Sequence, residues 1–332
     1  MTQQALIEAS APQGRTAVRD LVAGQQVEGI FGVRERDLRQ RRNGDPWLRL
    51  VLCDRTGGIE AVAWDEAESR YSLAEPGTAV HVTGVFEVSE RWGAKVKLAD
   101  LRAAAPSEYS PEDLAAGSAV PVARLEQDLR ELLATVQEPE LRTLLDRFFA
   151  EGSPFWRRFR EAPAAKLYHQ AYRHGLLEHT LTVAQAVSAA AALFPGIDRD
   201  IAVTGALLHD IGKTEAYNDD AMAIDLTDAG RLLGEIPLGY YMVRRQIEEL
   251  PGFDPARAQA ILHIILSHHG ALEHGSPVVP CTREAVLVHM IDNLGGKLGS
   301  FDRLERELPD GEQWSGFDRA LEGAAFFGRS AA

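Results

Sequence analysis

A histidine and an aspartate, His209 and Asp210, stand side by side at the end of an apolar run whose spacing predicts a helix. Polar groups beside such an apolar face are costly to bury unless they are paired or bind a metal. Imidazole and carboxylate together form a mixed ligand set that suits Mn, Fe, Zn or Mg rather than a structural thiolate site. The pair therefore predicts a metal site whose remaining ligands come from elsewhere in the chain.

Other histidines and aspartates occur on or at the ends of further helical patterns. His179 begins a long apolar helix, the pair His268 and His269 ends another, and Asp292 follows an apolar run in a third. Several helices could direct these side chains into one cavity, as in metal sites of helix bundles. A single histidine in such a helix is more often a packed core residue. The whole series, in this order, favours a metal centre.

The motifs around these residues resemble the HD-domain metal-dependent phosphohydrolases, and most closely the YhaM-type 3′→5′ exoribonucleases. The similar motifs are Gly-Leu-Leu-Glu-His-Thr at 175–180, Leu-Leu-His-Asp-Ile-Gly-Lys at 207–213, Ser-His-His-Gly at 267–270 and Ile-Asp-Asn-Leu at 291–294. The resemblance covers most of residues 125–302. In that family an OB-fold domain precedes the HD domain.

The resemblance implies a role for each motif residue. His179, His209, Asp210 and Asp292 would form the principal metal site, and His209, Asp210 and Lys213 would be the catalytic residues. The expected cofactor is a divalent metal, Mn²⁺ first, with Mg²⁺, Co²⁺ or Fe²⁺ as alternatives and one or two ions bound. His268 and His269 would bind a second ion or contact the phosphate. Lys166, His169 and Lys213 would hold the substrate's phosphate.

Three positions differ from the family's usual residues. Glu235 stands where a histidine usually helps to bind the second metal, and glutamate is itself a competent ligand for hard cations. We therefore keep Glu235 in the expected ligand set. His174 replaces a usual glycine, and Gly295 replaces a usual acidic residue. These differences leave open the number of ions, the preferred metal and the rate.

The composition limits the classes of protein that the chain can belong to. Its 332 residues suit two domains, and a 45% hydrophobic content predicts a compact protein. The first residues do not have the pattern of a secretory signal, and no apolar run approaches the length of a membrane span. Cys53 and Cys281 are too few and too isolated for a disulfide framework. We expect a cytoplasmic protein without membrane association.

Two regions with different patterns predict a multidomain fold: a small all-β OB-fold barrel followed by an all-α HD-domain helical bundle. Residues 18–104 are expected to form the OB-fold, because five short strand patterns are separated by turn residues. The expected strands are 26–33, 47–53, 58–64, 79–88 and 94–101. Residues 105–122 read as a linker rich in proline, and residues 123–330 as the helical domain.

The barrel carries features typical of proteins that bind single-stranded nucleic acid. Five arginines lie between the first two expected strands: Arg34, Arg36, Arg39, Arg41 and Arg42. Aromatic residues are interleaved with the basic ones, although aromatic side chains in strands are more often core residues. The net charge of −14 argues against general affinity for nucleic acid, but most of the acidic excess lies beyond residue 104. A local basic groove therefore remains compatible with the charge.

The resulting hypothesis is a metal-dependent 3′→5′ exonuclease that converts single-stranded RNA, and also DNA, to nucleoside 5′-monophosphates. Polarity and RNA preference are implied by the resemblance alone. A first alternative is a phosphohydrolase acting on small or cyclic nucleotides. A second alternative is a nucleic-acid-binding protein whose HD site has decayed. The sequence leaves the oligomeric state open.

Overall fold

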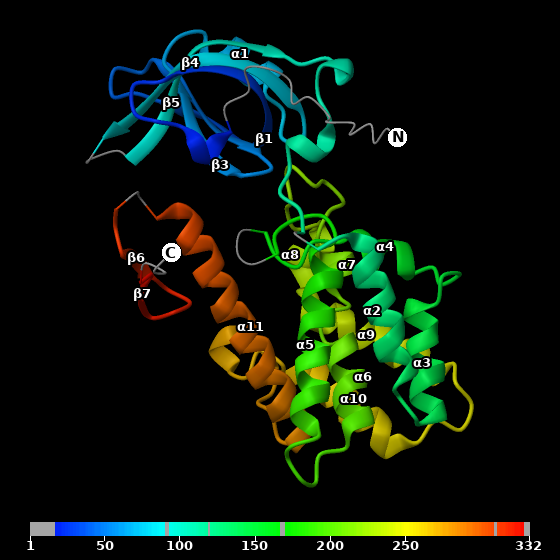
Figure 1. Ribbon diagram of the computed structural model, residues 1–332. Coiled ribbons are helices and arrows are strands. Elements are labelled where there is room, and N and C mark those ends of the chain that lie inside the picture. Colours follow the sequence, from blue (N-terminus) through cyan, green and yellow to red (C-terminus); the bar gives the residue numbers. More distant parts are fainter. Residues whose placement is uncertain (1–16, 90–92, 119, 167–169, 309–310, 329–332) are drawn as a thin grey trace, which may run out of the picture. The chain divides into compact units, whose positions relative to one another are not determined.

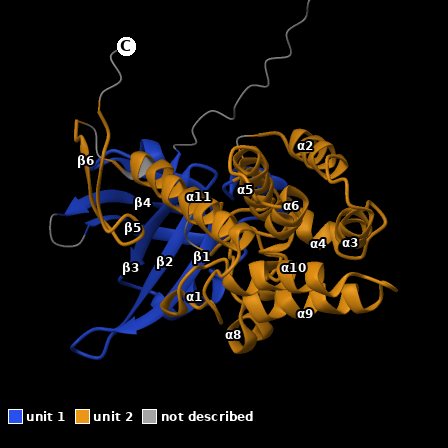
Figure 2. Cartoon of the chain, turned by 90° about the horizontal axis from the view of Figure 1, so that it is seen from below, with its two compact units in different colours: residues 1–116 blue, residues 117–332 orange. Residues whose placement is uncertain are grey.

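The chain folds into two compact units, residues 1–116 and residues 117–332 (Figure 2). The computed structural model describes residues 17–89, 93–118, 120–166, 170–308 and 311–328. Each unit encloses an apolar core of its own. Unit 1 contains the residues that we expect to form the OB-fold, and unit 2 contains those expected to form the helical domain.

Unit 1 contains a closed five-stranded barrel (Figure 1). Its strands are β1 (Gln26–Gln40), β2 (Pro46–Asp54), β3 (Gly57–Ala63), β4 (Ala79–Ser89) and β5 (Gly93–Ala103). The strand order is β1-β2-β3-β5-β4; β3 and β5 pair in parallel, and the other neighbours pair antiparallel. Helix α1 (Ala67–Leu73) connects β3 to β4. This arrangement is an OB-fold, so the predicted fold of the first region is confirmed.

The barrel core follows the two-residue period of its strands. Leu48, Leu50 and Leu52 on β2 are fully buried, so the residues between them point away from the core. β1 is longer than predicted, because it continues past residue 33 and pairs with β2 as far as Gln40. Polar residues dominate this extension, so the sequence carried no apolar alternation that would have revealed it. Most of the arginine cluster therefore lies in a β-hairpin instead of a loop.

Unit 2 is mainly helical (Figure 1). Its longer helices are α2 (Val122–Ala134), α3 (Pro139–Phe149), α5 (Gly175–Ala191), α6 (Arg199–Leu208), α9 (Glu235–Glu248), α10 (Pro255–Ser267) and α11 (Arg283–Glu307). The shorter helices are α4 (Trp156–Glu161), α7 (Lys213–Ala216) and α8 (Asp228–Leu233). Helix α6 lies in the centre, since every residue from Ala202 to Leu208 is buried. Helices α5, α10 and α11 pack against it.

Two details of unit 2 differ from the sequence prediction. The apolar pattern of residues 230–250 by itself predicts one continuous helix, but the chain breaks at Gly234, whose φ of 79° ends α8 before α9 begins. A two-stranded hairpin, β6 (Trp314–Asp318) and β7 (Gly323–Phe326), follows α11 in a region predicted to be all-α. No helix among the described residues has the length and apolar character needed to span a bilayer.

Candidate metal centre

Four side chains from α5, α11 and the end of α6 converge in the interior of unit 2. His179 lies in the second turn of α5, His209 and Asp210 directly follow α6, and Asp292 lies on α11. The Nε2 atom of His179 lies 3.2 Å from Asp210 Oδ2 and 3.1 Å from Asp292 Oδ1. The Nε2 atom of His209 lies 3.3 Å and 3.7 Å from the same two oxygens. The ligand atoms of His179, His209 and Asp292 all lie within 4.8 Å of one another.

The other nitrogen of each ring faces an oxygen outside this cluster. Nδ1 of His179 lies 3.2 Å from Gln170 Oε1, and Nδ1 of His209 lies 2.6 Å from the carbonyl oxygen of Ala206. A carbonyl oxygen can only accept a hydrogen bond, so each Nδ1 carries the proton. In the neutral rings both Nε2 atoms are then left as acceptors. Fixing the ligand tautomer in this way is typical of metal-binding histidines.

The cluster therefore fits a divalent cation. The two Nε2 atoms lie 3.3 Å apart, and both face carboxylate oxygens. So many acceptor atoms repel one another unless a proton or a metal ion lies among them. Asp210 Oδ1 is in addition buried without a hydrogen-bond partner. Two imidazoles and two carboxylates match the ligand preferences of Mn, Fe, Zn and Mg.

The pKa shifts show how strongly the cluster attracts positive charge. Burial alone would lower the pKa of His209, but the adjacent carboxylates of Asp210 and Asp292 outweigh burial and raise it to about 10. The pKa of His179 is raised in the same way against the effect of burial. Burial opposes ionisation of Asp292, yet hydrogen bonds from the two histidines hold its pKa well below its usual range. The carboxylates thus stay ionised and attract positive charge to the cluster.

Lys213 adds a permanent positive charge beside Asp210. Its Nζ atom donates a hydrogen bond to Asp210 Oδ2 over 2.7 Å, and its side chain is largely buried. Burial would lower its pKa, but the charges of Asp210 and Glu235 outweigh that effect and raise it. The residue is therefore an ammonium ion at the edge of the cluster.

His268, His269 and Glu235 lie on a second side of Asp210. His268 Nε2 is 3.5 Å from Asp210 Oδ1, and neither atom has a hydrogen-bond partner. His269 Nε2 is 3.4 Å from Glu235 Oε1, and both side chains are partly exposed. The two oxygens of Asp210 thus face the two groups of histidines, Oδ2 toward His179 and Oδ1 toward His268. The second group is the more open of the two.

Close backbone packing brings Glu235 to this position. A Cβ atom on Gly212 would lie 2.0 Å from the carbonyl oxygen of Glu235, so only glycine allows the start of α9 to lie against the chain after Asp210.

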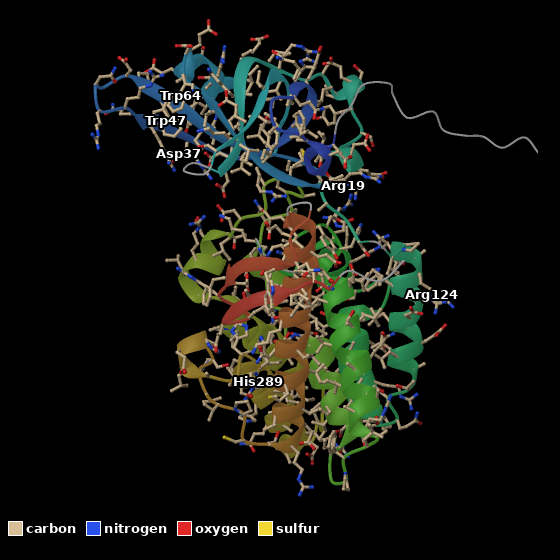
Figure 3. The ribbon with its side chains drawn as sticks, turned by 60° about the vertical axis from the view of Figure 1, so that its left-hand side comes forward. Arg19, Asp37, Trp47, Trp64, Arg124 and His289 are labelled. Carbon is tan, nitrogen blue, oxygen red and sulfur yellow. The ribbon has the colours of Figure 1, made fainter. Side chains whose placement is uncertain are left out.

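Helix α10 ends at Ser267, so His268 and His269 directly follow the helix, as the sequence predicts. Its end is fixed by His289 on α11, labelled in Figure 3, whose Nδ1 donates to the carbonyl oxygen of His268 over 2.8 Å.

Of the residues expected to bind phosphate, Lys213 lies at the cluster and Lys166 lies outside it. Lys166 Nζ lies 3.0 Å from Asp225 Oδ1, and the lysine side chain is partly exposed. Arg231 binds the other oxygen of Asp225 over 2.8 Å. His169 lies outside the described residues.

The arginine cluster of the barrel is packed on aromatic side chains. Trp47 and Trp64 stack with ring centroids 5.0 Å apart and lie together at one end of the barrel (Figure 3). The guanidinium of Arg39 covers Trp47 at 5.5 Å, and that of Arg41 covers Trp64 at 4.9 Å. Each tryptophan of the pair is thus in contact with an arginine of the cluster.

The five arginines differ in how firmly the barrel holds them. Arg41 donates to the carbonyl oxygen of Trp64, and Arg36 donates to that of Tyr71 while its guanidinium covers the Tyr71 ring. Arg39 is exposed and pairs with Asp37 over 2.5 Å. Arg42 is exposed, whereas Arg34 and Arg36 are partly buried.

Two of the positions that differ from the family's usual residues do not join the cluster. His174 precedes α5 with a left-handed φ of 71°, and its Nδ1 donates to the carbonyl oxygen of Arg160. This hydrogen bond holds the Nδ1 side of the His174 ring on the carbonyl oxygen of Arg160. Gly295 lies on α11, and a Cβ atom there would meet no atom within 4 Å.

Sequence reasoning missed one residue of the site, Gln170. Its side chain accepts from His179, and its backbone is left-handed with a φ of 56°. A Cβ atom on Gly175 would lie 2.0 Å from the Gln170 carbonyl oxygen, so the loop lies tightly against the start of α5. A polar residue in an irregular segment gives no periodic signal. Its closeness in sequence to His179 was the one available indication.

Both domains of the chain match families of known proteins. Residues 176–296 match the HD domain family, and residues 32–98 match the OB-fold nucleic acid binding domain. The 3′-5′ exoribonuclease YhaM of Bacillus subtilis (strain 168) is 30% identical, over 92% of this chain and 95% of that protein. The chain belongs to the YhaM family. The YhaM protein of Bacillus velezensis is 31% identical over the same shares of the two chains.

The family assignment agrees with the geometry of the site. The span that matches the HD domain includes all four residues of the principal cluster. HD domains depend on a metal, and the convergent imidazoles and carboxylates of this YhaM-family chain are suited to hold one. The predicted family and the predicted fold class, an OB-fold barrel followed by a helical HD domain, are thus confirmed.

Proposed function

We propose that this chain is a hydrolase of the metal-dependent 3′→5′ exonuclease type, acting on single-stranded RNA, and also DNA, and releasing nucleoside 5′-monophosphates. The observation that carries the proposal is the convergence of two histidine Nε2 atoms and two carboxylates in a chain of the YhaM family. Its YhaM relatives are named 3′-5′ exoribonucleases.

His179, His209, Asp210 and Asp292 would hold a divalent ion, for which Mn²⁺ is our first choice. Such an ion supplies the Lewis acidity that activates water at neutral pH and polarises a phosphoryl oxygen. Glu235, His268 and His269, together with Asp210, would hold a second ion. The Nδ1 hydrogen bonds keep both histidines of the first group in the ligand tautomer before the substrate arrives.

Charged residues around the cluster would bind the substrate's phosphates. Lys213 is the buried cation nearest to Asp210 and would neutralise charge that develops on the phosphoryl oxygens. Lys166 would contact the neighbouring phosphate after exchanging its partner Asp225 for the substrate. We also assign His169 to substrate binding, on the resemblance of its motif to the family.

The barrel would guide the single strand. Arg34, Arg36, Arg39, Arg41 and Arg42 would contact the phosphate backbone, and guanidinium groups lying flat on indole rings keep their outer N–H groups available for such contacts. We propose residues 18–104 as the nucleic-acid-binding domain, residues 105–122 as the linker and residues 123–330 as the catalytic domain. We further propose that the protein acts in the cytoplasm, since Cys53 and Cys281 are thiols in the structure.

A time course on a single-stranded RNA labelled at its 5′ end tests this function. The reaction is run with Mn²⁺, with Mg²⁺ and with a chelator, beside an Asp210→Ala variant. We expect a ladder that shortens from the 3′ end with Mn²⁺, with nucleoside 5′-monophosphates as products. The chelator and the variant should abolish the ladder.

Other outcomes point to the alternative functions. Turnover of mononucleotides or cyclic nucleotides with an intact RNA label would indicate a small-molecule phosphohydrolase. Binding of RNA without any metal-dependent cleavage would indicate a decayed site. Undiminished cleavage by Asp210→Ala would contradict the assignment of the site.

A further inference from the structure

Helix α11 has two faces of opposite character. One face directs Asp292 into the metal cluster. The opposite face carries an apolar ridge that we define as Val286, Met290, Leu294 and Leu298, spaced four residues apart. Their exposed fractions are 46%, 56%, 51% and 56%, although Leu and Met are usually buried. A regular ridge of this kind differs from single exposed apolar residues, which need no explanation.

The ridge is also poor in charge. Between Ala285 and Phe301, the charged residues are Asp292, which faces the metal cluster, and Lys297. The chain as a whole carries a net charge of −14, so most of its surface would repel another copy. The ridge is therefore a surface on which two copies could approach without strong repulsion.

An apolar groove of about 680 Å³ lies beside the first half of the ridge. Val286 and Met290 form one wall, and residues after α5 form the other, among them Phe194, Pro195 and Ile197. Leu193 and Phe194 at its rim are 77% and 58% exposed. The face thus offers both a ridge and a groove, which are the complementary parts of a helix-packing interface.

We propose that this face binds a second copy of the chain, with the two α11 helices packed antiparallel about a two-fold axis. Ridges of residues four apart form the commonest class of helix packing in globular proteins. A two-fold axis near Asp292 would place Val286 against the partner subunit's Leu298, and Met290 against the partner subunit's Leu294. Each ridge would then end beside the groove of the other copy. The metal clusters would lie on the opposite faces of the two helices.

The size of the face agrees with such a pairing. The ridge, Leu193 and Phe194 expose roughly 600 Å² of mostly apolar surface, near the upper limit for a patch on a monomer. A standard interface buries about 800 Å² on each partner, so the apolar face with its rim would be sufficient. A nucleic acid would need several basic residues here, and this face offers only Lys297 beside the ridge and Arg283 at the groove.

The oligomeric state of the full chain tests this proposal by light scattering after size-exclusion chromatography at a concentration of about 20 µM. We expect the wild type to have the mass of an assembly of at least two copies. Leu298→Glu would place an uncompensated charge in the interface and weaken association by about 100-fold. The matched control is Leu272→Glu, because Leu272 is 62% exposed but lies outside α11.

A charge-pairing experiment tests the proposed register. Val286→Glu and Leu298→Lys should each be monomeric alone. An equimolar mixture of the two variants should form a dimer, because the introduced carboxylate of one chain would meet the introduced ammonium group of the other. Far-UV circular dichroism confirms that each variant is folded. A monomeric wild type would overturn the proposal and leave the ridge to a different protein. Unchanged assembly of Leu298→Glu, or no recovery on mixing, would also overturn it.

Discussion

The Nε2 atoms of His179 and His209 lie 3.3 Å apart, each in a ring whose Nδ1 proton is given to an oxygen outside the cluster. Two nitrogen lone pairs directed at each other and at carboxylates are unfavourable without a cation between them. In the metal-free protein that cation is a proton, which the raised pKa values of both histidines allow. In the working enzyme we expect a metal ion to replace it.

Binding of the metal should release protons. His209 has a pKa of about 10 in the metal-free protein, so at pH 7–8 a proton must leave before the nitrogen can bind the ion. Its raised pKa stabilises the metal-free fold fully below the ordinary value of 6.5, and this stabilisation is lost as the pH rises towards 10. Metal affinity should therefore increase between pH 6.5 and pH 8.5. Calorimetric titration with Mn²⁺ in buffers of different ionisation enthalpy measures the released protons, and an affinity independent of pH would contradict the prediction.

Metal binding should stabilise unit 2 against heat. A free-ion concentration of 100 times Kd adds about 2.7 kcal/mol to the free energy of unfolding. For a unit of this size the melting temperature should rise by roughly 5–10 °C. Differential scanning calorimetry with Mn²⁺ and with chelator checks the shift. Asp292→Asn should show no shift, whereas Leu272→Ala, which lies outside the cluster, should retain it.

Gln170 should act by positioning His179, since its side-chain oxygen holds the Nδ1 proton of that ring. Gln170→Leu removes the acceptor and should weaken metal affinity by about 10- to 100-fold, as is typical for residues that orient a ligand. Gln170→Glu keeps an acceptor and should retain most of the affinity. Equal losses in the two variants, measured by calorimetric titration, would show that Gln170 serves only the loop's structure.

Arg39 and Arg41 should have separable roles in the barrel. Arg39 is exposed and should contact a phosphate, so Arg39→Ala should weaken RNA binding and reduce the salt slope by about 1. Arg41 binds the Trp64 carbonyl oxygen and covers its ring, so Arg41→Ala should destabilise the barrel by about 1–2 kcal/mol. Fluorescence anisotropy at several salt concentrations and urea unfolding measure the two effects. Arg19→Ala, at another exposed arginine of unit 1, is the control and should change neither.

The residues of the principal cluster could be predicted because each lies on or directly after an apolar helical pattern. The period fixes which end of α6 or α10 carries the histidines, and a buried polar pair there has few roles other than metal binding. The end of α10 before His268 was predictable for the same reason. Resemblance to the YhaM family then supplied the grouping of the four ligands.

The remaining features depend on contacts that sequence patterns do not record. Gln170 reaches His179 from an irregular loop, and the approach of Glu235 depends on the missing Cβ of Gly212. The extension of β1 is polar on both faces, so it looked like a loop in the sequence. The stacking of arginines on Trp47 and Trp64 likewise appears only when the hairpin brings separate segments together.

The most direct test of the central claim compares wild type and His209→Ala for both metal binding and RNA shortening. One preparation of each is titrated with Mn²⁺ and then given 5′-labelled single-stranded RNA under single-turnover conditions. We predict that the variant loses the tight Mn²⁺ site and the 3′ shortening together, while far-UV circular dichroism stays unchanged. A folded His209→Ala protein that still binds Mn²⁺ tightly and shortens RNA at the wild-type rate would contradict the account.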